Sequence, residues 1–171
     1  MAQPPVSPGA LRTGDRGSRG RSHAALADRL PRNPTTWCRL LCLATGPFLL
    51  LDGLGGLIFA PTAFSVGDHL PREDWNFLFQ FNGWHNALHI VNGAVLTAGA
   101  VRRSWSAPAT LLFGLSYAVM APVGFIDGDD VFNLFYSGTR ENLVHTFFAL
   151  EGVFFGSVGL AAAAASRRAA L

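Results

Sequence analysis

The sequence predicts an all-α integral membrane protein, a four-helix bundle built from two parallel-repeat helical hairpins and preceded by a disordered N-terminal tail. Half of its 171 residues are apolar and only 14% are charged, which is too apolar for an ordinary soluble domain. Four apolar segments each approach the roughly 20 residues that a helix needs to cross a hydrocarbon core of about 30 Å. A polar unit opens two of these segments, which indicates a duplicated hairpin.

The N-terminal region, residues 1–36, is rich in Arg, Pro and Gly. It holds one short apolar patch and cannot bury enough surface to fold alone. We therefore expect residues 1–36 to form a disordered cytoplasmic tail.

The four apolar segments define a transmembrane domain over residues 37–165. The expected spans are about 38–60, 83–101, 108–126 and 142–165. Residues 166–171 then form a short C-terminal cytoplasmic tail.

The distribution of Arg predicts the orientation. Eleven of the 13 basic residues, all of them Arg, lie in the N-terminal flank, in the loop after the second segment and at the C-terminus. Four crossings put these three regions on one side, which the positive-inside rule assigns to the cytoplasm. We therefore expect a multi-pass protein of the bacterial plasma membrane with both termini cytoplasmic. Its Arg-rich face would contact anionic lipids, and we expect no nucleic-acid partner. Whether the chain forms a homo-oligomer stays open.

An Asn-x-x-His unit occurs twice, 56 residues apart, as Asn86 to His89 and as Asn142 to His145. Each unit opens a helix that returns from an acidic, aromatic loop. Because two crossings restore the direction of the chain, the two copies are expected to be parallel repeats.

One face of the second segment is polar. At about 100° per residue on a helix, five polar residues fall within an arc of about 120°. They are Asn82, His85, Asn86, His89 and Asn92, and Gly93 lies on the same side.

In the fourth segment, His145 shares its face with small residues that allow another helix to approach closely. These are Ala149, Gly152, Gly156 and Gly159. The polar stripe and the small-residue stripe predict that the second and fourth segments face each other in the bundle. On this interpretation the Asn and His side chains hydrogen-bond across helices and pack the bundle.

Two carboxylates lie inside expected spans. Asp52 and Glu151 are both about 12 to 14 Å from the outer end of their helices. Two interpretations remain for them: neutral acids that donate hydrogen bonds, or groups that handle protons or cations.

A metal or haem site is the alternative to packing. His85 and His89 are spaced to present both imidazoles on one helix face, and His145 would add a third ligand. His89 and His145 would alternatively be the axial ligands of a haem. Neither site has a supporting Cys or zinc-protease signature, so no cofactor is predicted. No nucleotide-binding or nucleophile motif occurs either, and we expect a protein without enzymatic activity.

The arrangement resembles the DUF4383 family of small four-span bacterial membrane proteins, best known from actinobacteria. The resemblance rests on paired Asn-x-x-His-x-x-x-Gly motifs that open the second and fourth spans. The first motif, Asn86 to Gly93, matches in full, whereas the second ends at Ala149 where Gly is expected. The resemblance covers about residues 37–165 and implies the architecture and the membrane location, but no activity. Asp52 and Glu151 are not part of the family pattern.

Overall fold

The computed structural model describes residues 33–59, 64–67, 73–74, 80–128 and 130–170. In chain order the helices are α2 (Pro34–Phe59), α3 (Gly83–Val101), the 3-10 turn η1 (Arg103–Trp105), α4 (Ser106–Ile126) and α5 (Thr139–Arg168). The strands are β1 (Glu73–Asp74), β2 (Gln80–Phe81), β3 (Asp130–Val131) and β4 (Phe135–Tyr136). The all-α class is confirmed, and the expected tail over residues 1–32 lies outside the described residues.

Two helices extend beyond their expected ends. Residues 34–36, which we had assigned to the tail, form the first turn of α2. Pro34 suits the first helical position, and the Asn33 side chain accepts a hydrogen bond from the Thr35 amide at 3.0 Å. At the other end, α5 continues past residue 165 because its Ala-rich sequence favours helix, and Arg167 and Arg168 complement the helix dipole.

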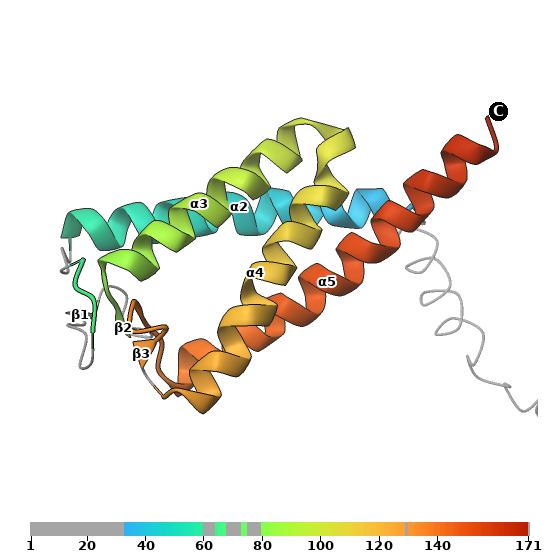
Figure 1. Ribbon diagram of the computed structural model, residues 1–171. Coiled ribbons are helices and arrows are strands. Elements are labelled where there is room, and N and C mark those ends of the chain that lie inside the picture. Colours follow the sequence, from blue (N-terminus) through green and yellow to red (C-terminus); the bar gives the residue numbers. More distant parts are fainter. Residues whose placement is uncertain (1–32, 60–63, 68–72, 75–79, 129, 171) are drawn as a thin grey trace, which may run out of the picture. The chain divides into compact units, whose positions relative to one another are not determined.

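The helices pack as two hairpins. α2 packs mainly along α3, and α4 packs mainly along α5 (Figure 1). A two-residue antiparallel ladder lies in each connection: β1 with β2 between α2 and α3, and β3 with β4 between α4 and α5. We expected these connections only as acidic loops, and two-residue strands are too short to leave a periodic signal in the sequence.

Equivalent contacts recur in the two hairpins. Gly46 of α2 packs on the backbone of Thr97 in α3, and Gly114 of α4 packs on the backbone of Val153 in α5. Farther along, Gly56 lies against the side chain of Asn86. Gly124 lies against the side chain of Asn142 in the same way. Both members of the repeat therefore use the same positions, which supports the duplicated hairpin.

The His residues of the second and fourth segments do meet inside the bundle, but the expected contact of the second segment with the small-residue stripe of the fourth is wrong. The small residues of α5 face α4 rather than α3: Gly152 packs on Gly114, and Gly156 packs on Leu111. Gly159 lies next to Cys38 of α2 and Ala107 of α4. Small residues thus bring together the helices within a hairpin, because a missing side chain lets two backbones touch.

The second helix follows the same rule. Gly93 of α3 packs on Gly46 and Leu50 of α2, not on α5. Ala149 of α5 belongs to the buried core. α3 and α5 meet instead through large side chains, as the rings of His85 and His145 show with centroids 5.2 Å apart.

Three helical segments among the described residues are long and apolar enough to cross a membrane. They are α2, the stretch Arg103–Ile126 and α5. α3 is not among them, although it has 19 residues. Its two His and two Asn side chains lower its hydropathy, and all four are buried inside the bundle.

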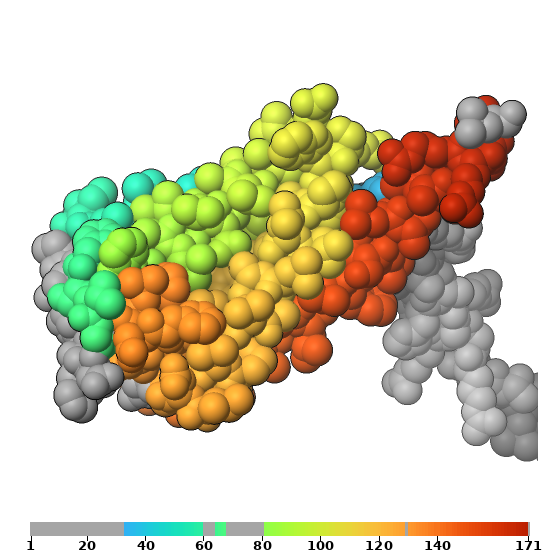
Figure 2. Space-filling view, viewed as in Figure 1, coloured from blue at the N-terminus to red at the C-terminus, as the bar shows by residue number. Residues whose placement is uncertain are grey.

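The connection between α4 and α5 reaches across to the first hairpin. Asn82 caps α3, because its side chain accepts a hydrogen bond from the His85 amide at 3.0 Å. The same side chain donates to the Leu134 carbonyl at 2.8 Å. Figure 2 shows this connection, in orange, packed against the beginning of α3, in green. It therefore holds the polar end of α3 in place.

A side chain at Gly114 is expected to separate α4 from α5. A Cβ atom there would overlap the backbone of Gly152 and Val153. Gly114→Val should lower the free energy of unfolding by about 1–3 kcal/mol, measured by thermal denaturation in detergent. Ala161→Val, on the exposed side of α5, is the control. Equal melting temperatures for the two variants would contradict this packing.

Candidate functional site

Three histidines from both hairpins meet inside the bundle. One ring nitrogen from each of His85, His89 and His145 lies within 4.8 Å of the other two. The three residues are at most 4% exposed. The ring of His85 contacts both others, with centroids 4.7 Å from His89 and 5.2 Å from His145. The repeat explains the meeting: His89 and His145 are each the seventh residue of their helix.

His89 is held by Asp52. Its Nδ1 atom lies 2.8 Å from Oδ2 of the carboxylate, which comes from α2 and is buried. A carboxylate accepts hydrogen bonds, so Nδ1 donates and carries the proton. In the neutral imidazole the other ring nitrogen, Nε2, then has a bare lone pair.

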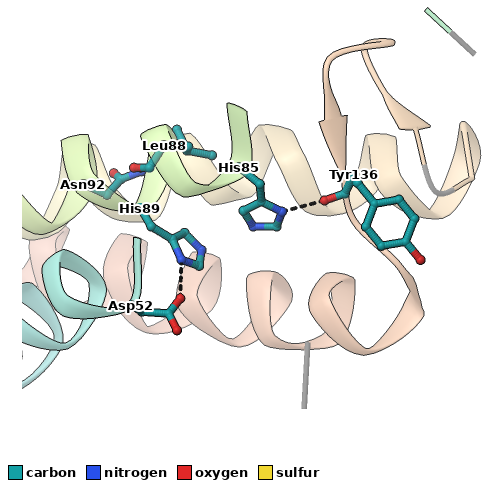
Figure 3. A network of polar contacts seen from close by, with 6 residues as sticks. All are labelled: Asp52, His85, Leu88, His89, Asn92 and Tyr136. Atoms are coloured by element: carbon teal, nitrogen blue, oxygen red, sulfur yellow. Dashed lines mark hydrogen bonds and ion pairs between the residues drawn. The ribbon is translucent and has the colours of Figure 1, made fainter. Parts of the chain in front are cut away.

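His85 is held by a backbone carbonyl. Its Nδ1 atom hydrogen-bonds to the oxygen of Tyr136, the last residue of β4. A carbonyl can only accept, so Nδ1 is again the donor and Nε2 again carries a lone pair. Figure 3 shows the rings of His85 and His89 next to each other, with these two hydrogen bonds leaving in different directions.

His145 reaches the same state through a serine. Ser137 Oγ donates its only proton to Oδ1 of Asn142 at 2.7 Å. Asn142 Nδ2 donates back to the Ser137 carbonyl at 3.1 Å, which fixes the orientation of the amide. Ser137 Oγ can therefore only accept from His145 Nδ1, 3.3 Å away, so His145 also presents Nε2 as a lone pair.

Two of the three Nε2 atoms are enclosed by protein. Those of His85 and His89 are buried and have no hydrogen-bond partner among the described residues. Buried polar atoms normally have a partner, so two such atoms on neighbouring rings point to a group that would bind them. Only a group that brings positive charge or a proton can bind a cluster of lone pairs.

A cavity of about 240 Å³ adjoins the cluster. His89, His145 and Asp52 form part of its wall, together with the buried carboxylate residue Glu141. The remaining lining is apolar and consists of Phe48, Leu49, Phe81, Val144 and Phe148.

The other expected site residues have structural positions around the cluster. Asn86 packs against Gly56 as described above, and Asn92 accepts a hydrogen bond from Ser116 of α4 at 3.1 Å. Glu151 is half-buried on α5 and does not line the cavity. The expected set therefore divides into the His cluster with Asp52, the Asn residues that pack helices, and Glu151 outside.

Sequence reasoning missed three contributors: Tyr136, Ser137 and Glu141. Tyr136 acts through its backbone, which no side-chain pattern reveals. The repeat could have identified Glu141, because a shift of 56 residues aligns it with His85 of the cluster. Both residues are buried. The full repeated unit is thus an ionisable residue, then Asn, then His three residues later.

The site lies within a recognised domain. Residues 39–158 match the family model described as a domain of unknown function, DUF4383. The chain belongs to this family. The matched part of the DUF4383 protein contains all three His residues of the cluster and Asp52. No curated protein and no solved structure matched the chain.

The hydrogen bonds in this DUF4383 protein predict one tautomer for the whole cluster. In metal-free protein, the three buried imidazoles should carry the proton on Nδ1 and not on Nε2, which ¹⁵N NMR of the His side chains distinguishes. Ser137→Ala should alter the His145 signals and leave those of His89 unchanged. A proton found on Nε2 of His85 or His89 would contradict the assignment.

Proposed function

We propose that this chain is a membrane protein that binds one divalent transition-metal ion through Nε2 of His85, His89 and His145. The observation that carries the proposal is the shared state of the three rings. Each Nδ1 is bound to an acceptor, which leaves three lone pairs directed away from those acceptors in a buried cluster.

The partners of the Nδ1 atoms are those that metal-binding imidazoles use. A metal-ligating His commonly donates its other N–H to a carboxylate, a backbone carbonyl or another acceptor, which fixes the ring and raises its basicity. Here the three acceptors are the Asp52 carboxylate, the Tyr136 carbonyl and the Ser137 hydroxyl. If these hydrogen bonds served only to hold the bundle together, the three rings would not all need to use Nδ1 for the bond and leave Nε2 free of that acceptor.

The spacing fits an ion after a small adjustment. Bonds of about 2.0–2.1 Å to zinc place tetrahedral nitrogen ligands about 3.4 Å apart. One ring nitrogen from each residue lies within 4.8 Å of the other two, so the three rings are close enough to share an ion after their side chains rotate. The cavity beside His89 and His145 would provide the open fourth position that sites with three protein ligands often keep.

A bare ion is favoured over haem. The flat porphyrin ring of a haem would have to fit between the two axial imidazoles, His89 and His145. His85 contacts both of these rings, so that space is occupied. The adjoining cavity is also smaller than the range of about 300–1,000 Å³ that drug-sized ligands use. Imidazole ligands suit Zn²⁺, Fe²⁺, Cu²⁺ and Ni²⁺.

The membrane arrangement belongs to the same proposal. α3 would be the fourth span, since its polar residues are buried in the bundle and only apolar side chains such as Val91 are exposed. Four crossings place both termini on the Arg-rich side, which supports a cytoplasmic assignment in the bacterial plasma membrane. Asn86 and Asn142 pack the hairpins, whereas the His residues bind. We propose a binding role and no catalytic one.

Metal content tests the proposal directly. Protein purified in detergent and loaded with Zn²⁺ should retain about one ion per chain by elemental analysis, because three neutral imidazoles form the site. His145→Leu should fall below about a tenth of that amount. Wild-type protein without stoichiometric metal would show that the cluster serves packing alone.

Asp52 should tune the affinity without being a ligand. Asp52→Asn keeps the size of the side chain but removes the charge that orients His89, and we expect metal affinity to fall by about 10–100-fold. Competition with a metal chelator measures the change. Glu151→Gln is the matched control, because it makes the same exchange outside the cavity. Unchanged affinity in Asp52→Asn would contradict the role of the carboxylate.

A further inference from the structure

The cavity beside the His cluster has a polar end and an apolar body. We propose that it binds a small, neutral, lipid-soluble molecule through one donor atom, which occupies the open position of the metal ion. This inference rests on the metal site proposed above.

The body of the cavity is built to enclose an apolar group. Phe48 and Leu49 come from α2, Val144 and Phe148 come from α5, and Phe81 comes from β2. No charged side chain lies among these five, so nothing in that part of the wall would pair with a charged ligand. A neutral ligand with an aromatic or aliphatic body fits this lining, because burial of apolar surface is the available driving force.

The polar end limits the ligand to one directed contact. His89 and His145 line the cavity there, and Nε2 of His89 is buried with no hydrogen-bond partner in the described part of the chain. The carboxylates of Asp52 and Glu141 flank the two rings and would repel an anion. A neutral nitrogen or oxygen donor is therefore the chemistry that this end accepts.

The position of the cavity indicates where the ligand enters. α2 and α5 belong to different hairpins, so the cavity lies at the seam between them. One of its lining residues, Phe48, is 54% exposed on the outside of the bundle. Neighbouring residues on that side of the two helices, such as Leu51 and Phe147, are also exposed and apolar. In a bilayer this surface contacts acyl chains, so the ligand would arrive from the lipid rather than from water.

The volume sets the size of the ligand. A dry cavity of about 150 Å³ is known to hold benzene, so about 240 Å³ admits one ring together with a small donor group. A long-chain lipid would not fit within the enclosed part. We infer a ligand that consists of one donor group joined to a single ring.

The test uses protein loaded with Co²⁺, whose visible absorption reports ligands at the open position. Imidazole and 4-phenylimidazole share the donor nitrogen and differ by one apolar ring. The dissociation constant of 4-phenylimidazole should be at least about tenfold lower than that of imidazole, because the additional ring buries apolar surface in the cavity.

A matched pair of variants locates the effect. Val144→Phe fills the cavity, and Leu143→Phe adds the same bulk at the neighbouring position, which is 61% exposed. Val144→Phe should weaken 4-phenylimidazole binding at least tenfold and leave Co²⁺ content unchanged, whereas Leu143→Phe should change neither. If Val144→Phe loses Co²⁺, Phe48→Trp narrows the cavity from its exposed edge and should give the same selective weakening.

The outcomes separate the two proposals. Wild-type protein that binds Co²⁺ but binds both probes equally, or equal binding in the narrowed variants and wild type, overturns the cavity inference and leaves the metal site standing. Wild-type protein that does not bind Co²⁺ overturns both.

Discussion

Polar atoms buried among membrane helices have no water to bond, so each must find its partner inside the protein. The rest of this structure follows from that constraint. α3 brings two His and two Asn side chains into the bundle, and neighbouring elements arrange themselves to meet them. Asp52 of α2 reaches His89, and the β4 backbone reaches His85. The constraint is met at Nδ1 of every ring. Among the described residues it is not met at Nε2 of His85 and His89, nor at a few other buried atoms such as Oδ1 of Asn86.

The duplication of the hairpin places equivalent residues at this site. Two copies of one hairpin place an Asn and a His at the same helical positions, the Asn against a glycine of the preceding helix and the His toward the interior. The copies differ where function would be expected: His85 in one corresponds to Glu141 in the other. A symmetric scaffold therefore holds an asymmetric set of groups: the three imidazoles cluster together, and the carboxylates of Asp52 and Glu141 line the adjoining cavity with His89 and His145.

The Asn and His residues of the repeated unit make different contacts. Asn142 fixes Ser137, and Ser137 in turn orients His145, so the Asn acts on the site from one residue away. Asn86 has no such relay and only fills the space beside Gly56. The Asn residues lie against glycines and neighbouring side chains of the bundle; that the Asn and His residues serve to pack it stays a prediction.

The sequence by itself determined the helical class, the duplicated hairpin and the candidate polar residues, because hydropathy and the 56-residue repeat are local signals. Only the tertiary structure decided which faces meet. The glycines of α5 could pack on any helix, and they pack on α4, because Gly114 offers a matching bare backbone there. Likewise, no pattern could place the Tyr136 carbonyl beside His85, since a backbone group has no signature in sequence. The direction of each ring nitrogen depends on such distant partners. The sequence therefore identified the histidines as candidates, whereas only the fold placed an acceptor beside Nδ1 of each ring.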